Sequence, residues 1–263
     1  MATKLSTSAL EDAESLEDKN LIANSMYVIG HTYYEQGNYD KTLNYYIPIL
    51  KICEEVGNTH CIGNINLSIG SSYWYKYDYD KALEYYGKAL KIQEKIDDKS
   101  GIAMSFINYA HYYIVIIHDY DKALDYHRRA LKIREEVGDE SNIVTSLINV
   151  GSVYSDKGDY DKALDYYERS FKIDEELGDK YGNGYILNNI GWTYYEIGKY
   201  NKALEYYNRG LKINEELDDK HSTSNDFTNM GLVYFQQAVY NEAVEYLDKS
   251  AKMQLEIDST ITL

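Results

Sequence analysis

Proline and cysteine are nearly absent from this 263-residue chain, which has one proline and two cysteines. A proline inside a helix removes a backbone donor and costs about 3 kcal/mol, so its scarcity permits long helices throughout the sequence. The single exception, Pro48, is expected to kink or break the helix that contains it. Two cysteines, Cys53 and Cys61, make no disulfide framework, and we expect them to pack at helix ends in a cytoplasmic, reducing environment.

Basic charge and long apolar runs are also scarce. The 27 lysines and arginines face 43 aspartates and glutamates, which gives a formal net charge of −16. A field of this sign repels phosphate backbones and anionic lipid surfaces, so we expect neither nucleic acid nor a membrane as partner. No stretch approaches the roughly 18 apolar residues that a membrane span needs, and no leader pattern is visible near the N-terminus. The acidity either solvates a long exposed surface or recruits a basic ligand.

Tyrosine is the main aromatic residue, with 31 copies against 4 phenylalanines and 2 tryptophans. Many of these tyrosines belong to a repeated segment. The segment Tyr39–Tyr45 reads Tyr-Asp-Lys-Thr-Leu-Asn-Tyr, and near-copies begin at Tyr79, Tyr120, Tyr160, Tyr200 and Tyr240. A period of about 40 residues is typical of a solenoid, in which a two-helix unit buries its apolar face against its neighbours. We therefore predict an all-α solenoid of antiparallel helix pairs with about six repeats.

Polar turns separate the expected helices. Asp159, at the end of a Lys-Gly-Asp turn, is expected to cap the helix that follows, and Gly57, Gly138 and Gly178 to close helices in the left-handed conformation. The expected first helices cover 21–36, 60–76, 100–117, 141–157, 181–197 and 221–237, and the second helices cover 39–56, 79–97, 120–137, 160–177, 200–217 and 240–257. In one continuous domain, an N-terminal segment with a partial helix (1–20) precedes repeats 21–58, 59–98, 99–139, 140–179, 180–219 and 220–258 and a tail, 259–263.

The third copy and the two ends depart from the pattern. The third copy is one residue longer, and an apolar run ending at His118 replaces its polar turn, so we predict a local bulge or an apolar patch there. Leu10 to Leu16 look like the tail of a second helix. Because solenoids normally need a polar cap at each end, we expect the ends to pair with something, possible end-to-end self-association included, or the chain to be part of a longer protein.

Small residues and tyrosines recur at fixed positions in every copy. The first small positions are Gly30, Gly70, Ala110, Gly151, Gly191 and Gly231; tyrosines follow three residues later; and Thr42, Ala82, Ala123, Ala163, Ala203 and Ala243 follow in the second helices. This series resembles the tetratricopeptide repeat (TPR), in a longer variant that is similar to kinesin light chains and to bacterial peptide-sensing regulators. The resemblance implies a right-handed superhelix whose first helices line a concave groove for peptides.

The resemblance also implies the residues of this groove. Asn108, Asn149, Asn189 and Asn229 occupy one position in four successive repeats, where an amide would grip the backbone of a ligand. Alternatively, each asparagine bonds the backbone of a neighbouring helix. The other expected lining residues are Tyr27, His31, Tyr34, Trp74, His111, Asn188, Trp192, Tyr195, Asn225 and Phe235.

Features of an enzyme or a metal site are missing from the sequence. It has no glycine-rich phosphate loop and no Gly-x-Ser-x-Gly motif, and its acidic residues recur at the same register in every copy, as on a solvated surface. His31 and His111 are two repeats apart, roughly 20 Å, which is too far to share a zinc ion. We therefore predict no catalytic residue, no metal and no cofactor.

Two functions from different classes remain. The first is a protein- or peptide-binding scaffold that uses the groove of the first helices. The alternative is a ligand-sensing regulatory segment of a larger signal-transduction or transcription-regulatory protein.

Overall fold

The computed structural model describes residues 10, 11, 13 and 15–261, and these residues form helices and turns without a strand. The chain divides into two compact units, here called unit 1, up to Val137, and unit 2, from Gly138. Unit 1 contains α2 (Lys19–Glu35), α3 (Tyr39–Glu55), α4 (Thr59–Tyr75), α5 (Tyr79–Lys95), α6 (Lys99–Tyr112), η1 (Tyr113–Ile117) and α7 (Tyr120–Val137). Unit 2 contains α8 (Glu140–Asp156), α9 (Tyr160–Leu177), α10 (Lys180–Glu196), α11 (Tyr200–Glu216), α12 (Lys220–Gln236) and α13 (Tyr240–Ile261).

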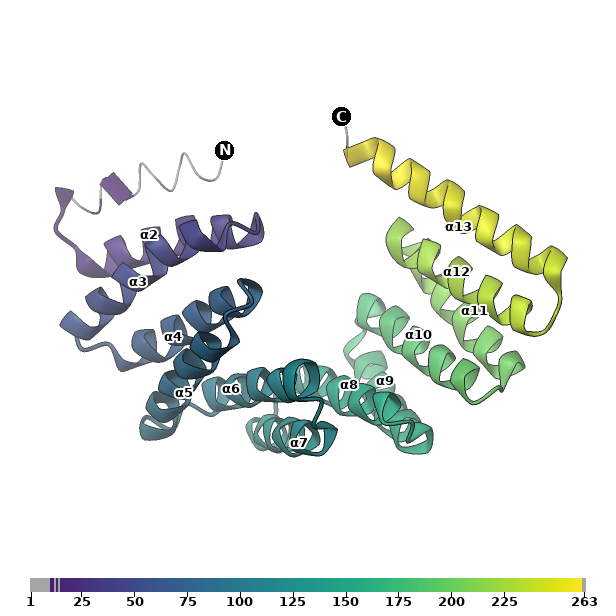
Figure 1. Ribbon diagram of the computed structural model, residues 1–263, viewed down its shortest axis with the longest axis horizontal. Coiled ribbons are helices and arrows are strands. Elements are labelled where there is room, and N and C mark those ends of the chain that lie inside the picture. The colour runs from purple at the N-terminus through teal and green to yellow at the C-terminus, as the bar shows by residue number, and fades with distance from the viewer. Residues whose placement is uncertain (1–9, 12, 14, 262–263) are drawn as a thin grey trace. The chain divides into compact units, whose positions relative to one another are not determined.

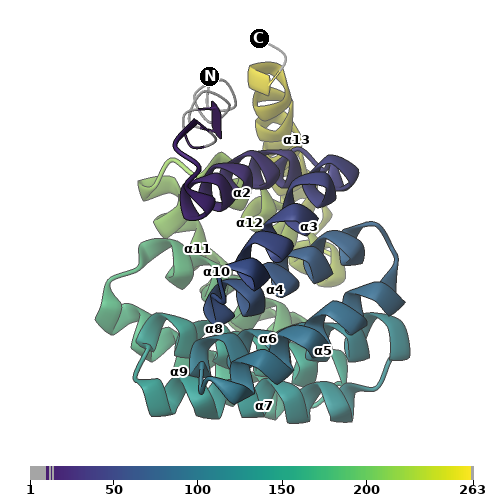
Figure 2. The ribbon, with the colours of Figure 1, turned by 90° about the vertical axis from the view of Figure 1, so that its left-hand side faces the viewer.

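Each unit is a stack of antiparallel helix pairs. In unit 1, α2 packs on α3, α4 on α5 and α6 on α7, and each second helix also contacts the first helix of the next pair. Figure 1 shows the first helices of a unit on one side and the second helices on the other, and Figure 2 shows the pairs of unit 1 stacked one below another. Unit 2 repeats the plan with α8 on α9, α10 on α11 and α12 on α13. The predicted all-α solenoid of helix pairs is confirmed.

The helix ends agree with the expected ones to within two residues, with two exceptions. The α-helical part of the expected 100–117 helix ends at Tyr112 and continues to Ile117 as η1, and α13 runs to Ile261, four residues beyond its expected end. Gly57, Gly138 and Gly178 have positive φ angles of 69°, 77° and 74°, so the prediction of left-handed helix ends is confirmed there. The capping role predicted for Asp159 is wrong, because its side chain caps no amide and instead forms an ion pair with Lys162. Most of the predicted 1–20 segment, and residues 262–263 of the tail, lie outside the described residues.

In four helix pairs, a glycine of the first helix lies beneath a tyrosine ring of the second helix. Ala82 is fully buried, and a Cβ atom added to Gly70 would lie 2.6 Å from the ring of Tyr86. The equivalent Gly151 lies under Tyr167, where a Cβ atom would be 2.8 Å from the ring. A helix pair can therefore close over a tyrosine ring only where the facing residue lacks a side chain.

The extra residue of the third copy is accommodated by a π-helix. The segment η1 continues α6, and the chain then turns at His118, which has a left-handed φ of 57°. One additional residue within a helix is accommodated by widening a single turn in this way. The prediction of a local bulge is confirmed, and Val115 and Ile117 are exposed on it.

Two helices differ from their expected character. Pro48 lies inside α3, which continues to Glu55 and has the same 17 residues as α5, so the predicted break is absent. The segment Lys99–Ile117, formed by α6 and η1, is long and apolar enough to cross a membrane, with a mean hydropathy of 1.2. One such segment is weak evidence of a span, and α6 packs between α5 and α7 as the other first helices of unit 1 pack on their neighbours.

Candidate functional site

Unit 1 carries a groove of about 560 Å³ along its first helices, here called the unit 1 groove. The predicted residues Tyr27, His31, Tyr34 and Asn108 lie together in its lining. The lining also includes Tyr46, Asn64, Leu67, Ser68, Ser71, Asp98, Ser100, Gly101 and Met104. The groove is thus aromatic at α2, and at α4 and α6 it is mostly polar with the apolar Leu67 and Met104 among the polar side chains.

Stacked rings fix the aromatic wall of the unit 1 groove. Tyr27 stacks on the buried ring of Tyr46 with ring centroids 5.4 Å apart. His31 lies between Tyr27 and Tyr34, with ring centroids 6.1 and 6.2 Å away. Burial raises the pKa of the Tyr46 hydroxyl above its usual value, so this ring stays neutral at physiological pH. The wall therefore offers apolar ring faces with hydroxyl and imidazole groups at their edges.

Unit 2 carries a smaller groove of about 230 Å³, here called the unit 2 groove. It brings together the predicted residues Asn188, Asn225 and Asn229. The remaining lining residues are Gly184, Tyr185, Asn214, Ser222 and Thr228. Most of these side chains are amides and hydroxyls, so the unit 2 groove is more polar than the unit 1 groove.

A buried carboxylate lies behind the unit 2 groove. Asp226 is fully buried, and it accepts hydrogen bonds from Nδ2 of Asn188 at 2.9 Å and Nδ2 of Asn214 at 2.7 Å. Nδ2 of Asn229 in turn donates to Oδ1 of Asn188 at 3.2 Å. Burial raises the pKa of the Asp226 carboxyl to about 6, while the two amide donors oppose that rise.

Four predicted aromatic groove residues pack against the next helix of their own repeat. Tyr34 contacts Tyr39, Trp74 contacts Tyr79, Tyr195 contacts Tyr200 and Phe235 contacts Tyr240, with ring centroids 5.0 to 5.9 Å apart. Each pair joins the end of a first helix to the start of the second helix. Of the four, only Tyr34 also lines one of the two grooves.

The asparagine series does not behave as one set. Asn108 lines the unit 1 groove, Asn149 is half-buried, and Asn229 bonds a side chain of the neighbouring first helix. Nδ2 of Asn189 is buried without a hydrogen-bond partner in the described part of the chain. The alternative, in which each asparagine bonds a neighbouring helix, thus describes Asn229, although the bond is to a side chain and not to the backbone.

Two predicted residues, His111 and Trp192, lie outside both grooves. His111 is exposed, and its ring is 5.8 Å from the ring of the buried His127. Burial, and to a smaller extent the nearby His111 and Arg134, lower the pKa of His127 to about 3, so His127 is neutral in the folded protein. Trp192 is exposed and stacks on Tyr195 at 5.3 Å.

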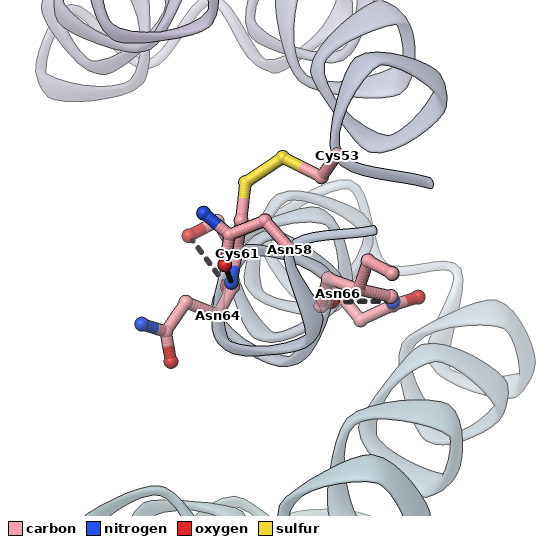
Figure 3. The surroundings of a disulfide bond; sticks show 7 residues. Cys53, Asn58, Cys61, Asn64 and Asn66 are labelled. Carbon is pink, nitrogen blue, oxygen red and sulfur yellow. Dashed lines mark hydrogen bonds between the residues drawn. A yellow bond between two sulfur atoms is a disulfide. The ribbon is translucent and has the colours of Figure 1, made fainter. Parts of the chain in front are cut away.

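The same position of five second helices carries a buried residue at each repeat junction. These junction residues are Cys53, Gln93, Arg134, Asp174 and Asn214. Cys53 is bonded to Cys61 across the turn from α3 to α4, as Figure 3 shows. The prediction that the two cysteines only pack at helix ends is wrong, because the short turn brings their Cα atoms within 5.8 Å, a separation that a disulfide can span.

Sequence reasoning missed several residues in and behind the unit 2 groove. Asp226, Asn214 and Gly184 were not expected there. A signal for Asp226 was present, because the same position in the two preceding repeats holds Ile186 and Ser146. A carboxylate at a position that is otherwise apolar or small indicates a buried polar contact.

Comparison with known proteins identifies the repeats. The model of the tetratricopeptide repeat family matches residues 21–95, 61–136 and 142–216. None of the curated proteins matches the chain significantly. A signal transduction ATPase with numerous domains from Pyrococcus horikoshii, which has a tetratricopeptide repeat sensor, matches with a TM-score of 0.76 and 21% identity over 93% of this chain. The chain spans only 38% of that protein.

Two further solved structures share the fold. A Rap protein complexed with competence and sporulation factor has a TM-score of 0.66 and 18% identity, over 95% of this chain and 80% of that one. A kinesin light chain protein of Podosopora anserina, with nearly identical TPR-like repeats, has a TM-score of 0.61 and 16% identity, over 73% of this chain and 94% of that one. The family match covers most of the sequence, and the chain therefore belongs to the tetratricopeptide repeat family.

Proposed function

We propose that this chain is a peptide-binding scaffold whose ligand lies along the first helices. The observation that carries the proposal is the unit 1 groove, a groove of about 560 Å³ lined by α2, α4 and α6. Apolar ring faces beside scattered amide and hydroxyl groups suit a peptide, which presents both apolar side chains and a polar backbone. The Rap protein whose fold it shares is complexed with competence and sporulation factor, which supports a binding role.

The unit 1 groove supplies both kinds of contact that a peptide needs. Tyr27 and Met104 are 41% and 44% exposed, so they offer apolar surface that a ligand can bury. Asn64 and Asn108 lie on the neighbouring helices α4 and α6, and each offers two donors and one acceptor. An extended backbone that crosses these helices would exchange hydrogen bonds with both amides.

Selection followed by titration tests the proposal. A library of random dodecapeptides is selected on the protein, and the enriched peptide is titrated calorimetrically into the parent and three variants. We expect Asn108→Ala and Tyr27→Ala each to weaken binding about tenfold. Asn44→Ala is the matched control, because Asn44 is exposed on the second helix α3. Enrichment of no peptide, or equal affinity in all variants, would contradict the proposal.

The asparagines at one position of four successive repeats provide a second test: Asn108, Asn149, Asn189 and Asn229. The double variant Asn149→Ala and Asn189→Ala should weaken the same peptide at least tenfold if the ligand extends along unit 2. Unchanged affinity would restrict the ligand to unit 1. Circular dichroism of each variant shows whether its helices remain intact.

The second candidate function is a ligand-sensing regulatory segment. It is favoured by the Pyrococcus horikoshii protein, in which repeats of this fold belong to a sensor within a longer chain. A sensor changes shape when its ligand binds, because only a differential affinity for two states can transmit a signal. Energy transfer between one dye on unit 1 and one on unit 2 should therefore change when the selected peptide is added. An unchanged transfer efficiency at saturation would favour the simple scaffold.

A further inference from the structure

The side chains of the unit 2 groove are oriented by carboxylates, and this orientation determines what the groove can bind. An ionised carboxylate accepts hydrogen bonds and donates none. Both oxygens of Asp226 are occupied, one by Nδ2 of Asn188 and the other by Nδ2 of Asn214. The amide nitrogens of these two asparagines must therefore point at Asp226, and their oxygens must point elsewhere.

The orientation of the Asn188 amide also fixes the orientation of the Asn229 amide. Oδ1 of Asn188 accepts from Nδ2 of Asn229, so the amide nitrogen of Asn229 also points inward. Oδ1 of Asn229 accepts no hydrogen bond from the residues that the structure describes, and Asn229 lines the groove. Oδ1 of Asn214 is likewise without a donor within the described part of the chain. Two amide oxygens are thus left as acceptors at the unit 2 groove.

Two further features extend this arrangement. The hydroxyl of Ser222 donates to Oδ2 of Asp219 at 2.7 Å, so its oxygen presents only lone pairs to the groove. Gly184 leaves room for Oδ1 of Asn214, because a Cβ atom at Gly184 would lie 2.6 Å from this oxygen. The unit 2 groove therefore presents three acceptor oxygens with two carboxylates, Asp219 and Asp226, behind them.

We propose that the unit 2 groove binds a cationic N–H donor of a ligand, a guanidinium or an alkylammonium group, through Oδ1 of Asn214, Oδ1 of Asn229 and Oγ of Ser222. A cationic donor satisfies acceptors that have no internal partner and also compensates the buried charge of Asp226. A neutral donor satisfies the acceptors only. This inference rests on the proposed function, since it assigns to a peptide ligand an arginine or lysine side chain at this groove.

Small cations that isolate the side-chain group test the inference. The protein, labelled with ¹⁵N at asparagine, is titrated with N-acetyl-argininamide, N-acetyl-lysinamide and N-acetyl-citrullinamide while the side-chain amide signals of Asn188, Asn214 and Asn229 are followed by NMR. Citrulline has nearly the shape of arginine without its charge. We expect saturable shifts with the arginine or the lysine probe and at least tenfold weaker binding of the citrulline probe. The stronger of the two cationic probes distinguishes guanidinium from ammonium.

Variants assign the effect to the groove. Asn229→Ala removes an outward oxygen without touching Asp226 and should weaken the cationic probe about tenfold, and Asp226→Asn should do the same by removing the charge. Asn44→Ala, exposed on α3 and outside both grooves, is the matched control and should change nothing. Thermal unfolding shows whether each variant is folded. Should Asp226→Asn fail to fold, Asn229→Ala still decides the question.

Three results would overturn the inference: no saturable binding of any cationic probe, equal binding of the citrulline probe, or full binding by folded Asn229→Ala. The two proposals fail separately. If a selected peptide binds the protein but the probes do not discriminate by charge, only the inference about unit 2 is lost. If the cationic probe binds but no peptide is selected, the peptide-binding function is lost and the cation site stands.

Discussion

Unit 1 and unit 2 are built on the same plan of stacked helix pairs, and they differ in the chemistry buried at their repeat junctions. In unit 1, Cys53 is bonded to Cys61, and the amide of Gln93 accepts from Ser105 at 2.7 Å. In unit 2, the junctions bury the carboxylates of Asp174 and Asp226, whose pKa values burial raises to about 6. Within each unit, the contacts that stack the repeats are therefore uncharged or covalent in unit 1 and ionisable in unit 2. Arg134, the last residue of this series in unit 1, is also buried and carries a charge.

The comparison shows that one set of positions packs the two helices of each pair together, and that another set, at the repeat junctions, distinguishes one repeat from the next. Glycine and alanine recur at the helix-pair contacts of both units, because a larger side chain would meet the residue packed above it, a tyrosine ring at Gly70 and Gly151 and Leu247 at Gly231. The junction position changes from repeat to repeat, and at three junctions it holds a specific pair: Cys53 with Cys61, Gln93 with Ser105 and Asn214 with Asp226. Buried polar pairs that are satisfied only by one partner are known to specify register in this way.

Packing at the helix-pair contact should show the largest effect and no difference between the units. Gly70→Val in unit 1 and Gly151→Val in unit 2 should each destabilise the protein by about 3 kcal/mol, because even a Cβ atom would lie within 3 Å of a tyrosine ring. Urea denaturation followed by circular dichroism measures the loss. Gly63→Ala is the control, since its Cβ atom would meet nothing closer than 3.4 Å. Wild-type stability in either valine variant would show that the tyrosine rings can move away.

Reduction of the disulfide should destabilise unit 1 and leave the stability of unit 2 unchanged. The bond joins residues eight apart in sequence, and closing so short a loop stabilises a fold by about 2.5 kcal/mol in the chain-entropy model. The chain has two tryptophans, Trp74 in unit 1 and Trp192 in unit 2, so Trp→Phe variants leave one fluorescent reporter per unit. With reductant, the Trp74 transition should move to lower urea while the Trp192 transition stays. A Cys53→Ala variant should reproduce the shift, and an equal shift of both reporters would show that the units unfold together.

Acidification from pH 7 to pH 5 should raise the stability of unit 2 and lower the stability of unit 1. Asp174 and Asp226 have folded pKa values of about 6, above the ordinary 3.8, so in this range the folded state binds more protons and stability rises as pH falls. His127 has a folded pKa of about 3, below the ordinary 6.5, so the unfolded state binds more protons and stability falls as pH falls. The free energy of unfolding of each unit should change by about 2 kcal/mol. If the unfolding transitions reported by Trp74 and Trp192 shifted with the same sign, this assignment would be contradicted.

Much of the fold could be predicted from the sequence because it depends on features that repeat. A tyrosine begins each second helix and a glycine or alanine lies at the helix-pair contact of each first helix, and both recur six times, so the helix pairs and their ends follow from periodicity alone. Even the π-helix at Tyr113–Ile117 left a signal, since that copy is one residue longer than the others.

The candidate site was harder to predict because it depends on features that do not repeat. Nothing in the period indicates that Asn229 would bond Asn188 while Asn108 lines a groove, since that difference comes from Asp226, present in one repeat only. The disulfide was missed for the same reason: two cysteines are too few to suggest a pattern, and only the geometry of the turn brings them together. The placement of Trp192 outside both grooves likewise follows from its stacking on Tyr195.

The smallest expected effect concerns Asp174, and it sharpens the comparison within unit 2. Asp174 is 3% exposed, and its Oδ2 atom has no hydrogen-bond partner among the residues that the structure describes, whereas both oxygens of Asp226 accept hydrogen bonds from asparagines. Removing an unpaired buried charge at pH 7 relieves its desolvation, so Asp174→Asn should stabilise unit 2 by about 1 kcal/mol and reduce its pH dependence by about half.

The matched variant Asp226→Asn should not stabilise unit 2 at pH 7. An amide at position 226 cannot accept from both Asn188 and Asn214, so one donor loses its partner, and that loss offsets the gain from removing the charge. Urea denaturation followed by Trp192 fluorescence at pH 7 and pH 5 compares the two variants. If Asp226→Asn were as stabilising as Asp174→Asn, the carboxylate of Asp226 would have no role in orienting the amides, and the three outward oxygens of the unit 2 groove would lose their structural basis.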